Sequence, residues 1–111
     1  MDRIETYRKA IQTALREFAS IPYSYGDLQL QTVFDTADDH YLLIVLGQEG
    51  LKRVHGCLIH IDIINQKIWI RRDETETGVA QELLNAGIAK EEIVLGFHPP
   101  EIRRQTGFAA E

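Results

Sequence analysis

Four side chains that can bind, stack or exchange protons share one face of a predicted β-hairpin. Residues 53–64 and 67–72 are rich in isoleucine, and the Asn65-Gln66 pair between them suits a tight antiparallel turn because Asn tolerates a positive φ. Side chains alternate between the two faces of a strand, so one face of this hairpin carries Ile59, Ile61, Ile63, Ile68 and Ile70 and is expected to be core. The opposite face collects an imidazole, a carboxylate, an indole and a guanidinium: His60, Asp62, Trp69 and Arg71.

The register of this hairpin follows from the turn, which places His60 opposite Arg71 and Asp62 opposite Trp69. A shift of one residue would bury the charged side chains, so we expect the register to be strongly specified. One interpretation of the polar face is a binding surface, since Trp and Arg are enriched at interface hot spots. The other is a solvated face on which Trp69 covers its neighbours and Asp62 pairs with Arg71. Both stay open, and the four residues are candidates for partner binding.

A second function class is an enzyme or ligand-binding domain in which His60, Asp62 and His98 converge on a pocket. A His–carboxylate pair can activate a nucleophile, but no nucleophile stands at a recognisable spacing from it. No glycine-rich phosphate loop opens a helix either. The sequence therefore predicts no catalytic residues.

His55 and Cys57 stand two apart on one predicted strand and could supply two zinc ligands. A structural zinc site needs four ligands, and neither a second Cys pair nor a His pair lies nearby. Cys57 shares its predicted face with Ile59, so we expect it to behave as a small buried hydrophobic residue. No metal and no cofactor are therefore expected.

The string His98-Pro99-Pro100 is distinctive because proline restricts its own backbone and that of the residue before it. This rigidity could present His98, Arg103 and Arg104 to a partner. It could also form an anchored turn that starts a last short helix, since proline suits the first helical position. The histidine and the two arginines join the candidates for partner binding.

Size and charge limit the function classes. The 111 residues suit one domain spanning 1–111, and the single cysteine excludes an internal disulfide, which favours a reducing, cytoplasmic setting. No stretch approaches the roughly 20 apolar residues that cross a bilayer. The net charge is −5, and the longest basic runs are the arginine pairs at 71–72 and 103–104. DNA binders usually carry basic stripes, so a protein partner is expected, with direct nucleic-acid binding by these pairs as a third alternative.

Hydrophobic periodicity and turn residues predict an α+β fold. We expect a four-stranded, mainly antiparallel sheet, with an N-terminal helix and C-terminal helices packed on one face. The predicted elements are a helix at 3–19, a loop at 22–27, strands at 28–36, 40–47, 53–64 and 67–72, a helix capped by Thr75 or Thr77 and ended by Gly87, an extended segment at 93–95, and a short helix after Pro99 and Pro100. An exposed strand edge or the Trp69 face could also support homo-oligomers.

Segments spanning almost the whole chain, taken together and in order, resemble the XisI family, the excision controlling factor of the fdxN DNA element. The segments are SYGD at 24–27, FDTADDHYLLI at 34–44, HGCLIHIDI at 55–63, KIWIRRDETETGVAQELL at 67–84 and GIAKEEIVLGFHPPEIRR at 87–104. None of these segments is a catalytic signature by itself. It is their joint occurrence, in this order, that makes the resemblance to the family specific.

This resemblance implies a non-catalytic controlling factor for programmed DNA excision during heterocyst differentiation. The family is described as acting with a partner, XisH, and a site-specific recombinase, XisF. XisH resembles endonuclease-type folds, which implies a specificity or regulatory role for this chain, or an antitoxin-like role against a nuclease-like XisH. The resemblance assigns no catalytic residue.

Overall fold

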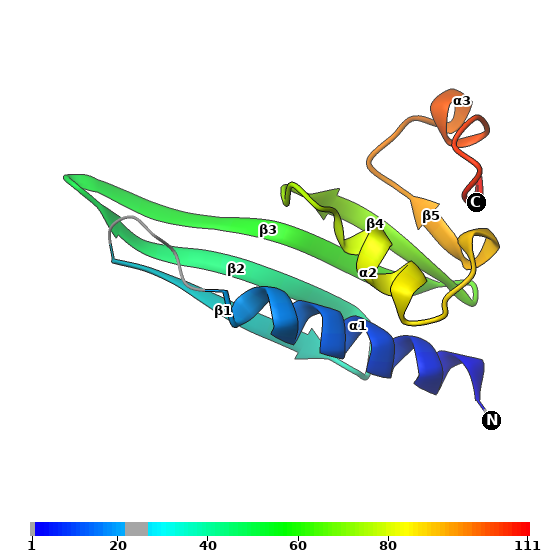
Figure 1. Cartoon of the computed structure of the whole chain (residues 1–111), viewed down its shortest axis with the longest axis horizontal. Coiled ribbons are helices and arrows are strands. Elements are labelled where there is room, and N and C mark those ends of the chain that lie inside the picture. The colour runs from blue at the N-terminus through cyan, green and yellow to red at the C-terminus, as the bar shows by residue number, and fades with distance from the viewer. Residues whose placement is uncertain (1, 22–26) are drawn as a thin grey trace.

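The computed structural model describes residues 2–21 and 27–111. Its elements, in chain order, are α1 (Arg3–Ala19), β1 (Asp27–Asp35), β2 (His40–Glu49), β3 (Lys52–Ile64), β4 (Lys67–Asp73), α2 (Val79–Asn85), the 3₁₀ helix η1 (Lys90–Glu92), β5 (Ile93–Leu95) and α3 (Pro100–Arg103) (Figure 1). The loop predicted at 22–27 lies outside the described residues except for Asp27, which begins β1. No helix in the described ranges is long and apolar enough to span a membrane.

Helix α1 forms where the sequence periodicity predicted it. The Asp2 carboxylate caps the helix by accepting a hydrogen bond from the backbone N–H of Ile4 at 3.0 Å. The apolar stripe of α1 faces the sheet, where it buries Tyr7, Ile11, Ala14 and Leu15. Burial of this stripe fixes the helix against the sheet.

Within residues 2–21 and 27–111 the sheet has five strands in the order β1-β2-β3-β4-β5, one more than predicted. The first four pair antiparallel, as expected, but β5 runs parallel to β4, with Ile68 opposite Ile93. The predicted strand number is therefore wrong, because the extended segment 93–95 is also hydrogen-bonded into the sheet. The side chains of Ile93 and Val94 are fully buried, which anchors this short strand.

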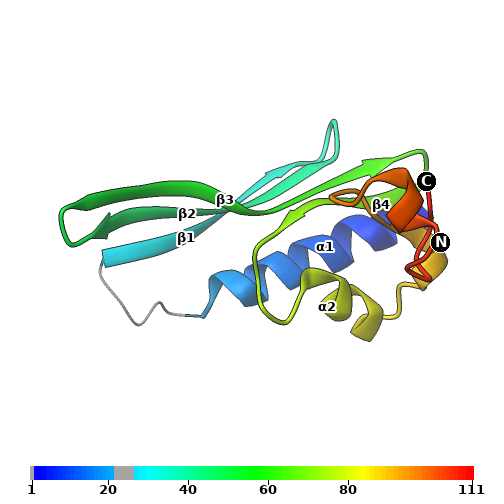
Figure 2. The ribbon, with the colours of Figure 1, turned by 90° about the horizontal axis from the view of Figure 1, so that it is seen from above.

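In the described part of the chain, α1 and α2 cover one face of the sheet and leave the other face without a helix (Figures 1 and 2). Helix α2 buries Val79 and Leu83 on the covered face, as predicted. Helix α3 does not pack there, and instead lies at the β5 edge of the sheet (Figure 1). The β2–β3 hairpin runs past the helices and ends at a turn where Leu51 is fully exposed (Figure 1).

The β3–β4 hairpin matches its prediction at the turn and on the core face. Asn65 and Gln66 have φ values of 51° and 61°, the left-handed pair that a two-residue type I′ turn requires. The isoleucines of the core face are buried between the sheet and the helices, fully for Ile59, Ile61, Ile68 and Ile70 and partly for Ile63. The core therefore fixes which hairpin side chains face outward.

Helix α2 begins differently from its prediction, in which Thr75 or Thr77 was the cap. Gly78 is the N-cap residue, with φ 85°. The Asp73 carboxylate reaches across the loop and accepts a hydrogen bond from the backbone N–H of Val79 at 2.7 Å. A carboxylate from the preceding strand therefore satisfies the start of the helix, in place of a threonine hydroxyl.

Candidate functional site

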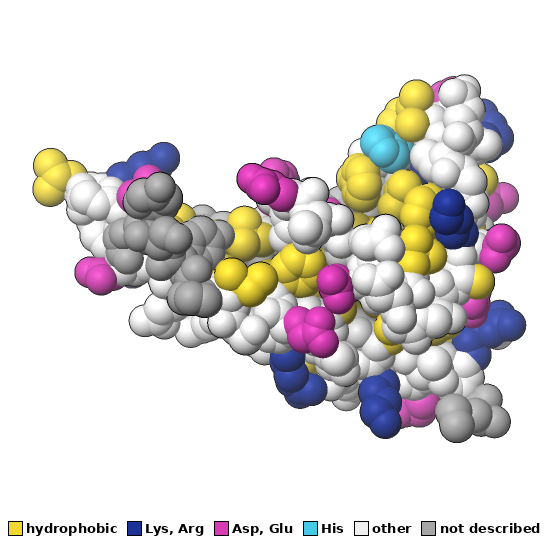
Figure 3. All heavy atoms as spheres, viewed as in Figure 1, with side chains coloured by type: hydrophobic (Ala, Val, Ile, Leu, Met, Phe, Trp, Pro, Cys, Tyr) yellow, Lys and Arg dark blue, Asp and Glu magenta, His cyan; other side chains and the backbone are white. Residues whose placement is uncertain are grey.

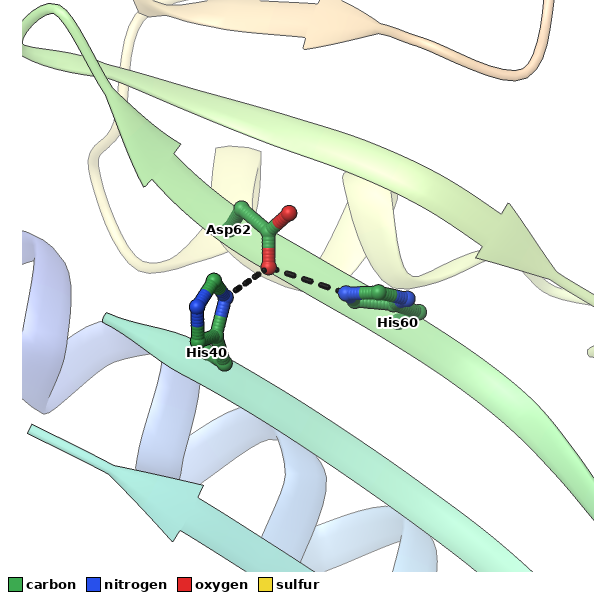
Figure 4. Close-up of side chains that lie close together, drawn as sticks. All are labelled: His40, His60 and Asp62. Atoms are coloured by element: carbon green, nitrogen blue, oxygen red, sulfur yellow. Dashed lines mark hydrogen bonds and ion pairs between the residues drawn. The ribbon is translucent and has the colours of Figure 1, made fainter. Parts of the chain in front are cut away.

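A buried carboxylate organises the uncovered face of the sheet. Asp62 is only 5% exposed, and its Oδ1 accepts hydrogen bonds from His40 Nδ1 at 2.8 Å and His60 Nε2 at 2.9 Å (Figure 4). Its Oδ2 accepts a third from Arg71 Nε at 2.7 Å. An ionised carboxylate can only accept, so both imidazole nitrogens that face it carry hydrogen. Both oxygens of the buried carboxylate are therefore satisfied.

The donors around Asp62 stabilise its ionised form, and Asp62 stabilises the protonated form of His40. Burial by itself would raise the pKa of Asp62, but the hydrogen bonds that it accepts, that from His40 foremost, hold this pKa below its usual value. The same hydrogen bond raises the pKa of His40, against the opposing effect of desolvation. Asp62 is therefore ionised at neutral pH, and Arg71 supplies a permanent opposite charge.

Strand pairing brings these side chains together. His40 begins β2 and stands directly opposite Asp62 of β3, and His60 lies two residues before Asp62 on the same face. This alignment requires a β-bulge, because Leu43 pairs with Ile59 while the next residue of β2 pairs with Cys57. Leu58 is thus the extra residue of β3, and it shifts the strand so that His40 meets Asp62.

A second bulge directs Arg71. His60 pairs with Arg72, and Ile61 pairs with Ile70, so Arg71 is an extra residue of β4. The predicted pairing of His60 with Arg71 is therefore wrong at this one position, although Asp62 opposite Trp69 is confirmed. Bulges turn a side chain away from its regular direction, and here the guanidinium reaches Asp62.

The turn before β2 is anchored to α1. Asp39 has a positive φ of 58°, and its Oδ1 accepts hydrogen bonds from Arg8 Nε and the Tyr41 hydroxyl, both at 2.8 Å. The hydrogen bond from Arg8 is the main reason that the pKa of Asp39 is lowered. These contacts fix the backbone immediately before His40 and thereby the position of its ring.

Trp69 extends the site towards the C-terminus. The Arg71 guanidinium lies 5.7 Å from the centroid of the indole ring, and the Arg103 guanidinium of α3 lies 5.3 Å from it. Both distances fit cation–π contacts. Five of the seven predicted candidates therefore form one continuous row on the uncovered face, which we name the Trp69 surface: His60, Asp62, Trp69, Arg71 and Arg103.

Beside this row is a hollow of about 400 Å³, whose lining includes Trp69 and Arg103. The Arg103 Nε atom is buried, and it has no hydrogen-bond partner among the described residues. Lys67 and Glu111 also line the hollow, and the Lys67 ammonium donates to the backbone carbonyl of Glu111. The hollow therefore combines an aromatic wall with two cationic side chains.

The remaining two candidates lie elsewhere. His98 is half-buried, and its ring packs against Phe97 with centroids 4.6 Å apart. Arg104 is exposed at the end of α3. Among the described residues, the group of histidine and acidic side chains with converging ligand atoms consists of His40, His60 and Asp62, without His98. The suggested convergence of His60 and His98 is thus absent from this group.

The residue that sequence reasoning missed is His40, and the Leu58 bulge also changes the position of Cys57. Cys57 was expected on the core face with Ile59, but it pairs with Ile44 on the uncovered face and is half-buried. Its Sγ donates to the carbonyl of Ile59 at 3.2 Å, and burial raises the pKa of the thiol. Neither Cys57 nor His55 belongs to the group around Asp62.

Comparison with known proteins agrees with the resemblance in sequence. The family described as "XisI protein" matches residues 1–110. A XisI-like protein from Anabaena variabilis ATCC 29413 is 34% identical, with a TM-score of 0.87 over 96% of this chain and 97% of that one.

A second solved structure, the fdxN element excision controlling factor XisI from Anabaena variabilis ATCC 29413, is also 34% identical. It has a TM-score of 0.84 over 99% of this chain and 100% of the other. No curated protein matches in a search of sequences. A family match over nearly the full length, joined to two full-length structural matches, leads to one conclusion: the chain belongs to the XisI family.

Proposed function

We propose that the chain is a non-catalytic controlling factor for excision of a DNA element, and that it acts by binding a XisH-like protein which works with a site-specific recombinase. Family membership and the similarity to the excision controlling factor from Anabaena variabilis support the regulatory role. The observation that carries the binding mechanism is the contact of the Trp69 ring with the Arg71 and Arg103 guanidiniums, on the sheet face that α1 and α2 leave uncovered. Tryptophan and arginine are the residue types that dominate interface hot spots.

The Trp69 surface is preorganised for binding. Arg71 is held by a hydrogen bond to Asp62 and by its contact with the indole ring, so its rotamer is already restricted before a partner arrives. Ordering a flexible side chain at an interface costs about 0.5–1.5 kcal/mol, and a side chain already held avoids most of this cost. A rigid aromatic anchor with fixed guanidiniums favours a specific protein contact.

Charge pairing favours a protein partner over direct contact with DNA. Arg71 pairs with Asp62, and Arg72 Nη2 lies 3.1 Å from a carboxylate oxygen of Glu74. A guanidinium already neutralised by a carboxylate releases few counterions from DNA, so it adds little affinity for phosphate. Figure 3 shows acidic and basic side chains interspersed over the helix-covered face, without a basic stripe.

The proposal is tested by co-purification with a XisH-like protein from the same organism, followed by a measured dissociation constant. Wild type is expected to form a complex, and Trp69→Ala is expected to weaken it roughly 30-fold, the effect of losing a hot spot worth about 2 kcal/mol. Leu51→Ala is the matched control, because Leu51 is an exposed apolar side chain at the far end of the β2–β3 hairpin. Absence of a wild-type complex, or equal weakening by both substitutions, would contradict the proposal.

Three alternative modes of action can be distinguished with the same purified proteins. Inhibition of nuclease activity of the XisH-like protein by added chain would identify an antitoxin-like role. Salt-dependent DNA binding that is lost in the Arg103→Ala, Arg104→Ala double variant would identify direct nucleic-acid contact. A change in oligomeric state with concentration, measured by sedimentation, would identify self-association through the sheet.

A further inference from the structure

Three potential metal ligands converge around Asp62. One ligand atom each from His40, His60 and Asp62 lies within 4.8 Å of the others, and each comes from a sheet residue (Figure 4). Exposed acidic clusters are common without metals, but this carboxylate is buried. Arg71 alone would balance the negative charge of Asp62. Charge compensation therefore does not explain why two imidazoles also bind the Oδ1 atom of this carboxylate.

We propose that His40 Nδ1, His60 Nε2 and Asp62 Oδ1 bind one divalent transition-metal ion of the zinc class, with a fourth coordination position open to solvent. Two imidazoles and one carboxylate form a ligand set that suits zinc and related ions, and sites with three protein ligands typically hold water or another small ligand in the open fourth position. This inference does not depend on the proposed function.

The distances fit an ion after small side-chain movements. A tetrahedral ion about 2.1 Å from each ligand separates the ligand atoms by roughly 3.4 Å. The two nitrogens now lie 2.8 and 2.9 Å from the shared oxygen. Neutral imidazoles would bind after the hydrogen on each coordinating nitrogen moves, through water, to the other ring nitrogen.

The surroundings hold the ligands in place. Arg71 Nε binds Oδ2 of Asp62 and leaves Oδ1 directed at the imidazoles, as outer hydrogen bonds do for ligating carboxylates. Asp39, bound to Arg8 and Tyr41, fixes the chain next to His40. The side chains of His40 and His60 are 53% and 35% exposed, which gives an ion access from solvent.

The test uses the full chain after treatment with a chelator, without any partner protein. Visible absorption follows titration with Co²⁺, and isothermal titration calorimetry follows Zn²⁺. We expect one ion per chain, with Co²⁺ displaced by Zn²⁺. His40→Ala and Asp62→Asn should each lower the affinity at least about tenfold. His55→Ala is the matched control, because His55 is an exposed histidine of β3 outside the group and should leave affinity unchanged.

Circular dichroism establishes whether each variant folds. Should Asp62→Asn unfold, the His40→Ala result decides, because the His40 side chain is half exposed and its loss leaves the core intact. The proposal is overturned if wild type binds no ion, if His40→Ala binds as tightly as wild type, or if His55→Ala weakens binding as much as His40→Ala does.

Discussion

His40 and Asp62 stand directly opposite each other in the register of β2 and β3, and a 2.8 Å hydrogen bond joins them. They are separated by 22 positions in the chain, and the β2–β3 hairpin connects them. The pairing connects the ionised Asp62 to β2. The turn before β2 is itself anchored to α1 through the hydrogen bond between Arg8 and Asp39. Stability of the fold and geometry of the site are therefore linked through Asp62.

Asp62→Asn tests this link. The substitution removes the charge that the donors share and leaves Arg71 without its carboxylate, so we expect a loss of about 2 kcal/mol in the free energy of unfolding, as for hydrogen bonds to charged groups. Urea denaturation measures the loss. Glu74→Gln is the comparison, since it breaks only the exposed pair with Arg72 and should cost less than about 1 kcal/mol. Equal losses would show that Asp62 contributes no more than a surface charge.

The sequence predicted the hairpins because their turns and their alternation are local signals. The tight turn at 65–66, the isoleucine face and the pairing of Asp62 with Trp69 all follow from counting outward from that turn. The fifth strand did not follow, because three residues show no periodicity and its partner lies in β4, more than twenty positions earlier.

The position of His40 was missed for a different reason, although a signal was present. In the β2–β3 hairpin, counting from the pair Glu49 and Lys52 without a bulge would place Tyr41 opposite His60, and would therefore put a histidine on the core face. With this unbulged register, the apolar residues of β2 and β3 would not share one face along the whole hairpin. Only a bulge, which adds one residue to one strand, brings them onto the same face. Testing the register of both hairpins for such a conflict would have predicted that His40 meets Asp62.

Tyr7 gives a prediction at high pH. Its hydroxyl donates to the Glu92 carboxylate, and burial, followed by this hydrogen bond, raises the pKa of Tyr7 from 10.0 to about 12. A pKa that is higher in the folded state contributes stability that is fully present below pH 10 and is lost as the pH rises through about 12. The stability advantage of wild type over Tyr7→Phe should therefore shrink across this window. Urea unfolding of both proteins at several pH values measures it, and a constant difference would contradict the assignment.

Two glycines of the β2–β3 hairpin provide a matched pair for backbone packing. A Cβ at Gly47, where φ is 143°, would lie 2.0 Å from the carbonyl oxygen of Asp27, whereas a Cβ at Gly50, where φ is 63°, meets nothing within 4 Å. Gly50→Ala should cost about 1 kcal/mol from backbone strain alone. Gly47→Ala should cost about 3 kcal/mol or more, because β1 must also move away. Thermal unfolding ranks the two, and the reverse order would show that β1 does not approach this closely.

Gly96 connects β5 to the Trp69 surface and can be probed without a partner. A Cβ there would lie 3.0 Å from Cε3 of Trp69 and 3.2 Å from the carbonyl oxygen of Ile70, so Gly96→Ala must displace the indole by a few tenths of an ångström. Trp69 is the single tryptophan, so its fluorescence reports this displacement directly. Gly56→Ala, with no atom within 4 Å of the new Cβ, is the control.

We expect Gly96→Ala to shift the emission maximum or its intensity, because the indole changes its distance from the Arg71 and Arg103 guanidiniums, and we expect Gly56→Ala to leave both unchanged. The same variant should weaken the XisH-like complex if the indole is its anchor, since binding depends on a fixed aromatic side chain. An altered spectrum with unaltered binding would place the contact elsewhere on the chain. An unaltered spectrum would instead show that Gly96 does not constrain Trp69.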